Sequence, residues 1–273
     1  MPAPDAIAPD KLAKLVGTPK SPIIVDLRHE DDFARQPRLI PAAKWYASDA
    51  LPEASAFSGG RSIVTVCGTG SAVSQGVAAT LRAQGIAAEY LEGGYAAWIA
   101  AGLPTFDPAK LPPADSQRAT HWVTRSRPKI DRIACPWLVR RFIDPDARFL
   151  FVAPSEVVRV GELFSAAPYD IEGVFWSHRG EDCTFDVMIA EFGLAIPALD
   201  RLARIIRGAD TARLDLEPEA AGLLAASLGL SRMYSDDREQ LEAGMLLYDA
   251  LFRWARDATG ETHNWPTNKG PAQ

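Results

Sequence analysis

The stretch IVTVCGTGSAVSQGVAATLRAQG, Ile63 to Gly85, decides the fold of the first half of the chain. Its first four residues are apolar or β-branched and indicate a buried strand. Cys67 follows, then a loop of small residues, then an alanine-rich helical pattern that begins near Val73. A strand that runs through a short loop into a helix is typical of a parallel sheet covered by helices.

Strand and helix patterns alternate through the first hundred residues. IIVDL (23–27) and AAEYL (87–91) predict strands, and APDKLAKLVG (8–17) and YAAWIAAG (95–102) predict helices. Residues 104–120 contain four prolines and no periodicity, so they predict an interdomain linker. We therefore expect an α/β domain over residues 1–104, a proline-rich linker over 105–119 and a second domain over 120–268.

The second domain is predicted to be mixed at first and then mainly helical. Strands are expected at HWVTR (121–125), RFLFVA (148–153) and GVFWSH (173–178), and helices at 155–164, 184–194, 197–208, 217–233 and 236–258. The last helix places an apolar stripe at i, i+3, i+4 spacing. The stripe consists of Leu241, Met245, Tyr248, Leu251, Phe252 and Ala255.

Composition excludes several classes of protein. The net charge of −6 gives no electrostatic reason to bind nucleic acid or a membrane surface. The first residues lack the pattern of a signal peptide, and no run of 18 apolar residues predicts a membrane span. The three cysteines are too few and too widely spaced for a disulfide framework or a CxxC zinc site. We expect a cytoplasmic protein that does not enter the membrane.

Cys67 is the candidate nucleophile. A reactive thiolate needs positive partial charge to lower its pKa. The small loop residues allow backbone N–H groups to turn inward, and the following helix adds the positive end of its dipole. The alternative is that Cys67 is only a packing residue. The predicted cradle for a thiolate, a persulfide or a bound anion consists of Gly68, Thr69, Gly70, Ser71 and Ala72.

Three further segments of the first domain resemble the rhodanese family. They are VDLRHEDDF (25–33), RLIPAA (38–43) and LEGGYAAWIAAGLP (91–104), with the cysteine loop between the last two. The resemblance implies a central parallel sheet and a cysteine that carries sulfane sulfur as a persulfide, taken from a small sulfur donor and passed to a thiophilic acceptor. It also implies sulfurtransferase activity.

The loop departs from the family pattern at the positions that usually carry arginine. Gly68 and Ala72 stand where members have arginines, and Arg38 stands where a histidine is usual. Charge-assisted hydrogen bonds are about twice as strong as neutral ones, so the loss of two guanidinium groups weakens thiosulfate binding most. We expect a persulfide carrier with poor thiosulfate:cyanide activity.

The second domain opens with a basic segment, residues 122–144. Arg125, Lys129 and Arg132 are the candidate oxyanion-binding residues, because several cationic donors can share the charge of a small dianion. The alternative is a solvated basic face paired with acids elsewhere. Within the segment, Cys135 precedes Pro136, so it is either the acidified first residue of a helix or a buried structural thiol.

Two polar segments of the second domain suggest a transition-metal site. SHRGEDCTFD (177–186) and ETHNWP (261–266) supply His178 and His263, joined by Cys183 or by an acid such as Asp210. Histidine and cysteine are ligands that zinc and iron accept. The alternative is that these histidines form structural hydrogen bonds.

Long motifs of the second domain resemble the C-terminal domain of ChrB-type chromate-resistance proteins. They are RPKIDRIACPWLVRRFIDP (127–145), SHRGEDCTFD (177–186), residues 207–232 and ETHNWP (261–266). Arg238 and Ala243 stand where members tend to have histidines, which weakens the case for a metal on that helix. The resemblance implies a role in chromate stress, with chromate or a similar oxyanion as ligand.

Two functional hypotheses remain. In the first, a sulfurtransferase-like domain works together with a chromate- or metal-binding domain. In the second, the protein is a non-catalytic sensor or regulator of a chromate-resistance operon. No helix-turn-helix pattern accompanies the basic segment, so direct binding of nucleic acid is disfavoured.

Overall fold

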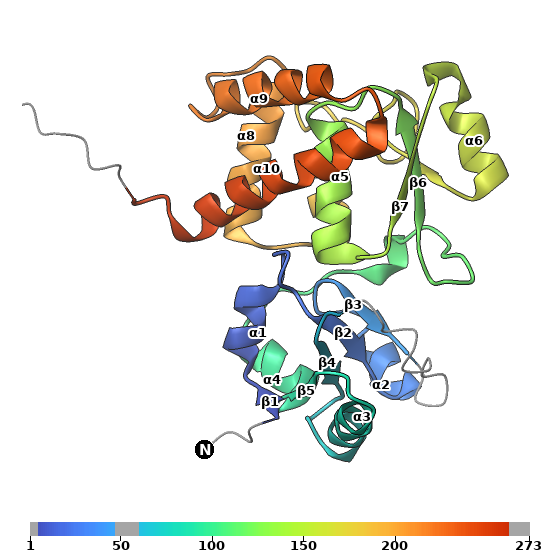
Figure 1. Ribbon diagram of the computed structural model, residues 1–273, viewed down its shortest axis with the longest axis vertical. Coiled ribbons are helices and arrows are strands. Elements are labelled where there is room, and N and C mark those ends of the chain that lie inside the picture. The colour runs from blue at the N-terminus through green and yellow to red at the C-terminus, as the bar shows by residue number, and fades with distance from the viewer. Residues whose placement is uncertain (1–4, 47–59, 262–273) are drawn as a thin grey trace, which may run out of the picture.

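The computed structural model describes residues 5–46 and 60–261. The first half contains one parallel sheet in the order β1-β5-β4-β2-β3 (Figure 1). Its strands are β1 (Ala6–Ile7), β2 (Ile23–Asp26), β3 (Ala43–Trp45), β4 (Ile63–Val66) and β5 (Ala88–Leu91). Its helices are α1 (Pro9–Leu15), α2 (Glu30–Arg35), α3 (Ala72–Ala83) and α4 (Gly94–Ala100). The predicted α/β class is confirmed.

The central strands are buried on both faces. Because successive side chains of a strand point to opposite faces, Ile24 packs with α1 and α4 whereas Val25 packs with α3. All four residues of β4 are buried, as the apolar run predicts. The sheet therefore holds the end of β4, and with it Cys67, in a rigid frame.

The second half combines a small parallel sheet, in the order β7-β6-β8, with helices (Figure 1). Its strands are β6 (His121–Arg125), β7 (Arg148–Val152) and β8 (Ala167–Pro168). Its α-helices are α5 (Asp131–Leu138), α6 (Val157–Phe164), α7 (Thr184–Phe192), α8 (Pro197–Asp210), α9 (Ala220–Met233) and α10 (Asp237–Asp257). None of the described helices is long and apolar enough to cross a membrane.

Two details of the second half differ from the expectation. Residues 173–178 form no strand: Gly173 has a positive φ of 83°, and only an isolated bridge joins Trp176 to Tyr169. The helix around Cys135 begins at Asp131, so Cys135 lies within it and not at its positive end. Pro136 has no N–H to donate to the carbonyl of Arg132, one turn earlier in the helix. The hydroxyl of Tyr169 donates to that carbonyl instead, so the proline is tolerated.

The apolar stripe of α10 is confirmed. Leu241, Met245, Tyr248 and Phe252 are buried, and Leu251 and Ala255 pack against the same core. Trp137 of α5 lies against the rings of Tyr248 and Phe252 and donates its indole N–H to Asp249. Helices α5 and α10 therefore share one aromatic core.

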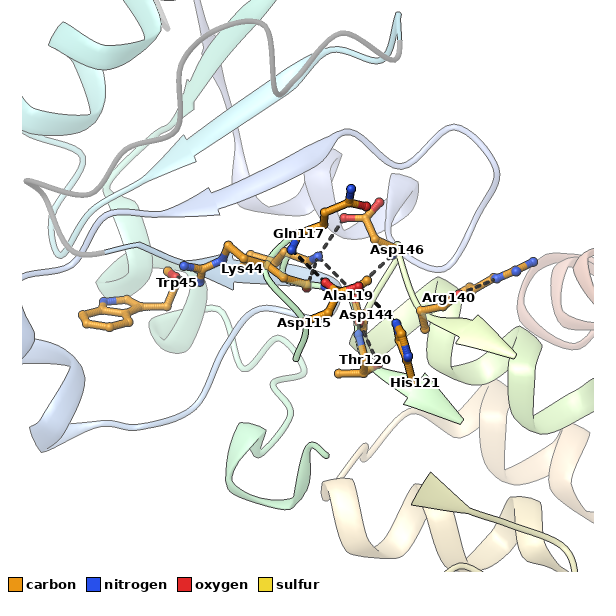
Figure 2. A network of polar contacts seen from close by, with 12 residues as sticks. Lys44, Trp45, Asp115, Gln117, Ala119, Thr120, His121, Arg140, Asp144 and Asp146 are labelled. Atoms are coloured by element: carbon orange, nitrogen blue, oxygen red, sulfur yellow. Dashed lines mark hydrogen bonds and ion pairs between the residues drawn. The ribbon is translucent and has the colours of Figure 1, made fainter. Parts of the chain in front are cut away.

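The two halves are joined by specific contacts. Leu39 pairs with Phe106 of the proline-rich segment, whose ring packs on Phe192 of α7. Arg38 donates to the carbonyls of Thr105 and Gly193. One continuous hydrophobic cluster extends through both halves. A polar network that includes Lys44 crosses the same boundary (Figure 2).

Candidate functional sites

Cys67 lies at the end of β4 and is only 5% exposed. Its Sγ accepts the backbone N–H of Ser71 at 3.2 Å and lies 3.1 Å from Oγ of Ser74. Ser71 precedes the first residue of α3, so the sulfur faces the start of that helix. Of the five residues of the predicted cradle, only Ser71 has a hydrogen bond to Sγ among the described contacts, and Ser74 is a partner that the sequence did not single out.

The electrostatics of this loop favour the thiolate. Burial raises the pKa of Cys67, but hydrogen bonds from Ser74 and Ser71 outweigh it, so the pKa lies below its ordinary value. The same donors would stabilise any anion carried on this sulfur.

The loop owes its shape to the glycine pair Gly93 and Gly94. Gly94 has φ +61°, and a Cβ there would lie 2.3 Å from the carbonyl oxygen of Cys67 and 2.4 Å from the nitrogen of Gly70. The next residue, Tyr95, donates its N–H to the carbonyl of Cys67 at 2.8 Å. The glycines thus let the start of α4 pack directly beneath the cysteine loop.

Arg28 and Arg38 form contacts away from the cysteine loop. Arg28 is buried, forms an ion pair with Asp26 at 2.7 Å and lies 3.6 Å from the ring centre of Tyr95. Arg38 donates hydrogen bonds to the carbonyls of Thr105 and, in the second half, Gly193. Within the described residues, no arginine, lysine or histidine makes a hydrogen bond to Sγ of Cys67. The cradle therefore consists of a backbone N–H and hydroxyl groups.

The basic segment of the second half divides into two groups. The first group is structural: Arg127 donates to carbonyls at the end of α9, Arg140 pairs with Glu242, and Arg141 pairs with Asp249. These arginines therefore fit the alternative interpretation of the basic segment, in which its cations are paired with groups elsewhere in the protein.

The second group consists of Arg125 and Arg132, which meet on one carboxylate oxygen. Oδ2 of Asp170 lies 3.2 Å from Nη2 of Arg125 and 3.3 Å from Nε of Arg132. Burial and the nearby charge of Arg125 lower the pKa of Arg132. Nε of Arg125 has no hydrogen-bond partner within the described chain. No ion pair brings Lys129 to this group in the described part of the structure.

Beside this pair lies a group that we call the Asp–His cluster, made of Asp131, Asp170, His178 and Asp210. Nε2 of His178 lies 3.3 Å from Asp170, 3.3 Å from Asp210 and 3.6 Å from Asp131. Hydrogen bonds to Asp170 and Asp210 raise the pKa of His178 to about 10. Asp131 is fully buried, and burial followed by the charges of Asp210 and Asp170 raises its pKa well above the usual range.

The predicted metal ligands are only partly brought together. His178 belongs to the cluster. Cys183 is the residue before α7, where its N–H donates to Asp186 and its thiol lies beside the carboxyl of Asp131. Burial and the charge of Asp131 raise the pKa of the Cys183 thiol, so it stays protonated. His263 lies outside the described residues. Burial likewise raises the pKa of Cys135, which supports the interpretation as a structural thiol.

Sequence reasoning missed Asp131 and Asp170. Asp131 begins the helix DRIACPWL, whose residues are apolar except for Asp131 and Arg132, and a buried acid in such a helix is a signal for a built site. Asp170 lies in a loop after β8 and leaves no short motif. The backbone is strained at both places, since the β-branched Ile130 has φ 45° and Asp170 has φ 54°.

Comparisons with known proteins agree with this architecture. The family model of the rhodanese-like domain matches residues 8–101, and that of the ChrB C-terminal domain matches residues 122–255. Protein ChrB of Cupriavidus metallidurans is 33% identical over 156 residues, which cover 56% of this chain and 44% of that protein. The match therefore spans less than half the length of that relative.

Two solved structures are similar to the first half. A thiosulfate sulfurtransferase from Pseudomonas aeruginosa is 33% identical, with 39% of this chain and 20% of that chain covered and a TM-score of 0.33. A rhodanese-like domain protein from Staphylococcus aureus is 33% identical, with 34% and 90% covered and a TM-score of 0.31. Both resemblances found in the sequence are confirmed by the family models: the chain carries a rhodanese-like domain at residues 8–101 and a ChrB C-terminal domain at residues 122–255.

Proposed function

We propose that this protein takes part in chromate resistance, with Cys67 as a carrier of sulfane sulfur and the ChrB C-terminal domain as the binding site of chromate or a similar oxyanion. The sulfur proposal rests on the groups that surround Sγ of Cys67. Sγ lies among a backbone N–H and two hydroxyl groups that stabilise negative charge, at the base of a loop held by Gly94.

The transfer follows from a thiolate at this position. The thiolate of Cys67 attacks the outer sulfur of a donor, such as a persulfide or thiosulfate. The sulfur–sulfur bond of the donor breaks, and the leaving thiolate or sulfite departs with the bonding electrons. The outer sulfur remains on Cys67 as a persulfide anion. The N–H of Ser71 and the hydroxyl of Ser74, which contact Sγ, would stabilise its negative charge. An acceptor thiolate then attacks that sulfur and restores Cys67.

The composition of the loop supports persulfide donors over thiosulfate. Thiosulfate is a dianion and gains most from guanidinium donors, whereas a persulfide donor carries less charge. Gly68 and Ala72 supply no such donors, and Arg28 and Arg38 are occupied in other contacts. We expect a persulfide donor to load Cys67 faster than thiosulfate does.

The oxyanion proposal is supported by Arg125 and Arg132. Two guanidinium groups that share one carboxylate oxygen keep donors free for another anion. Nε of Arg125 is buried and unpartnered, while the side chain as a whole is 42% exposed. This pair suits a tetrahedral dianion, and Lys129 is the weaker member of the predicted set.

Cyanolysis tests the sulfur proposal. After incubation with a persulfide donor and desalting, the wild type is expected to release one labile sulfur per chain, and Cys67→Ser none. Cys183→Ser is the matched control, because serine is a good residue before a helix and the labile sulfur should be unchanged. A wild type without labile sulfur, or equal loading of Cys67→Ser, would refute the proposal.

Calorimetric titration with chromate, and with molybdate as a non-oxidising analogue, tests the oxyanion proposal. Arg125→Met and Arg132→Met should each weaken binding at least tenfold, whereas Arg204→Met, an exposed arginine paired with Glu217, should not. Binding that is unaffected by the first two variants contradicts the proposal. The alternative of a non-catalytic sensor predicts chromate binding together with a Cys67 that can load sulfur but shows no turnover to an acceptor thiol.

A further inference from the structure

The Asp–His cluster concentrates more acceptors than its hydrogen bonds can satisfy. Nε2 of His178 lies within 3.6 Å of oxygens from three different carboxylates, but one ring nitrogen can donate only one proton. One donor atom each of Asp131, Asp170 and His178 lies within 4.8 Å of the others. Ligands held about 2.1 Å from one metal ion are about 3 Å apart in an octahedron, so small adjustments would bring these atoms onto one ion.

A second observation comes from Asp131, which is 0% exposed. Its Oδ2 accepts the N–H of Thr184 at 2.7 Å, at the start of α7, and faces His178. Its Oδ1 has no hydrogen-bond partner among the described residues, and the Cys183 thiol beside the carboxyl is a weak donor. A buried carboxylate oxygen without a partner is unfavourable unless a cation compensates it.

The surrounding residues orient the cluster as ligands are usually oriented. Asp170 turns Oδ1 toward His178 while that atom accepts the hydroxyl of Thr184, and its Oδ2 is held by Arg125 and Arg132. Such outer partners fix the direction of a ligand. Three ionised carboxylates against two guanidinium groups leave one negative charge, which an imidazolium, a proton on Asp131 or a bound cation balances.

We propose that Asp131, Asp170 and His178, with Asp210 as a fourth ligand, form a binding site for a divalent metal ion of the Mn²⁺ or Fe²⁺ class. Carboxylates favour Mn²⁺, and imidazole extends the range to Fe²⁺. This set keeps His178 and Asp210 of the sequence-based prediction and adds Asp131 and Asp170, with Cys183 left out. The ligands come from α5, the loop after β8, the loop before α7 and the end of α8, which explains why no short motif marks them.

A metal here would deepen the proposed oxyanion function. Counted together with Arg125 and Arg132, a dication changes the charge of the three ionised aspartates and two guanidinium groups from −1 to +1. His178 is 39% exposed and Arg125 is 42% exposed, so this side is open to solvent. An oxyanion could then contact the metal and a guanidinium group together. This last step rests on the proposed function, whereas the metal site itself does not.

The test is Mn²⁺ binding to the purified full chain after removal of metals with a chelator and dialysis. Free Mn²⁺ is followed by its electron paramagnetic resonance signal. The wild type should bind one Mn²⁺ and gain thermal stability with it. Asp131→Asn and His178→Gln should weaken binding at least tenfold, and their melting temperatures without metal show whether they fold. No stoichiometric Mn²⁺ or Fe²⁺ on the wild type, or unchanged binding by both variants, would overturn the proposal.

Two controls sharpen the result. Asp182→Asn removes a neighbouring, exposed carboxylate that pairs with Arg207 and should bind Mn²⁺ as the wild type does. Cys183→Ser should also keep the site, and a loss there would mean that sulfur is a ligand and the proposed set is wrong. Titrating chromate into the Mn²⁺-loaded protein separates the two proposals. Mn²⁺ binding without chromate binding refutes only the oxyanion function, and the reverse refutes only the metal site.

Discussion

Nζ of Lys44 lies 3.0 Å from Oδ1 of Asp144, across the boundary between the rhodanese-like domain and the ChrB C-terminal domain (Figure 2). Lys44 also contacts Asp146 at 2.7 Å and donates to the carbonyl of Arg118. The other oxygen of Asp144 accepts the N–H and the hydroxyl of Thr120. One lysine of β3 therefore ties the sheet of the first domain to the proline-rich segment and to the second domain.

Lys44→Met should destabilise the whole protein. The substitution leaves Asp144, which is almost fully buried, without its cation, and charged hydrogen bonds of this kind contribute about 2 kcal/mol. We expect the free energy of unfolding in urea to fall by about that amount. Lys20→Met, at an exposed position, is the matched control and should change little. Equal stability of the two variants would show that the lysine does not hold the domains together.

The contribution of Lys44 should depend on pH in one direction. Burial lowers its pKa, but the charges of Asp144 and Asp146 outweigh burial and raise the pKa above the ordinary value of 10.5. A raised pKa means that the stabilisation is complete below pH 10.5 and is lost as the pH rises through the pKa of the folded state. The difference in stability between wild type and Lys44→Met should be constant from pH 7 to pH 9 and shrink above 10.5. A difference that grows with pH would contradict this.

The two candidate sites differ in how far the sequence could reveal them. The Cys67 site is local: strand, loop and helix follow one another between Ile63 and Ala83, so pattern and position are enough to find it. What the sequence did not show is Ser74, because a serine one turn into a helix is indistinguishable from any other helical serine. The role of Gly94 depends on a packing contact with a loop more than twenty residues away.

The Asp–His cluster is non-local, and this is why only its histidine and Asp210 were named in advance. Asp131 and Asp170 are brought together by the packing of α5 against α7, where both carboxylates accept hydrogen bonds from Thr184, and no spacing encodes this. Cys135 was ambiguous for a related reason. Proline usually begins a helix, and here Pro136 lies inside one because the hydroxyl of Tyr169 replaces the missing partner of Arg132.

Tyr169→Phe tests whether the hydroxyl of Tyr169 stabilises α5 by donating to the carbonyl of Arg132. Tyr169 is fully buried, and its hydroxyl is 3.2 Å from the carbonyl oxygen of Arg132. Without the hydroxyl, this carbonyl in α5 is left unsatisfied, which costs about 1–3 kcal/mol. Urea unfolding should show a loss in this range. Because burial already raises the pKa of Tyr169 well above 10, the wild-type hydroxyl stays protonated, and the loss should be the same at pH 7 and pH 9. No loss would mean that the carbonyl finds another donor.

Ser74→Ala should make Cys67 less acidic. Oγ of Ser74 lies 3.1 Å from Sγ, and its hydrogen bond is the largest influence that lowers the pKa of this thiol. Removing it should move the pKa toward the ordinary value of 9.0 and reduce the thiolate fraction at neutral pH. The rate of alkylation by iodoacetamide, followed against pH by mass spectrometry of the Cys67 peptide, should show a midpoint at higher pH. Identical midpoints in the two proteins would contradict the role given to Ser74.

Gly94→Ala should disrupt the cysteine loop. A methyl group there would lie 2.3 Å from the carbonyl oxygen of Cys67, and alanine is disfavoured at φ +61°. The carbonyl oxygen and the left-handed conformation both belong to the main chain, so the clash is relieved only if the loop or α4 moves. We expect a loss of about 2 kcal/mol or more in urea unfolding, together with weaker sulfur loading of Cys67.

Gly76→Ala is the matched control for that change, because the same substitution meets different surroundings. Gly76 lies on α3, on the exposed side, and a Cβ there would have no neighbour within 4 Å. Alanine is favoured over glycine within a helix by about 1 kcal/mol, so Gly76→Ala should be neutral or stabilising and should load sulfur as the wild type does. If both alanine variants lost sulfur loading equally, the effect would belong to the helix–loop unit as a whole and not to the contact between Gly94 and Cys67.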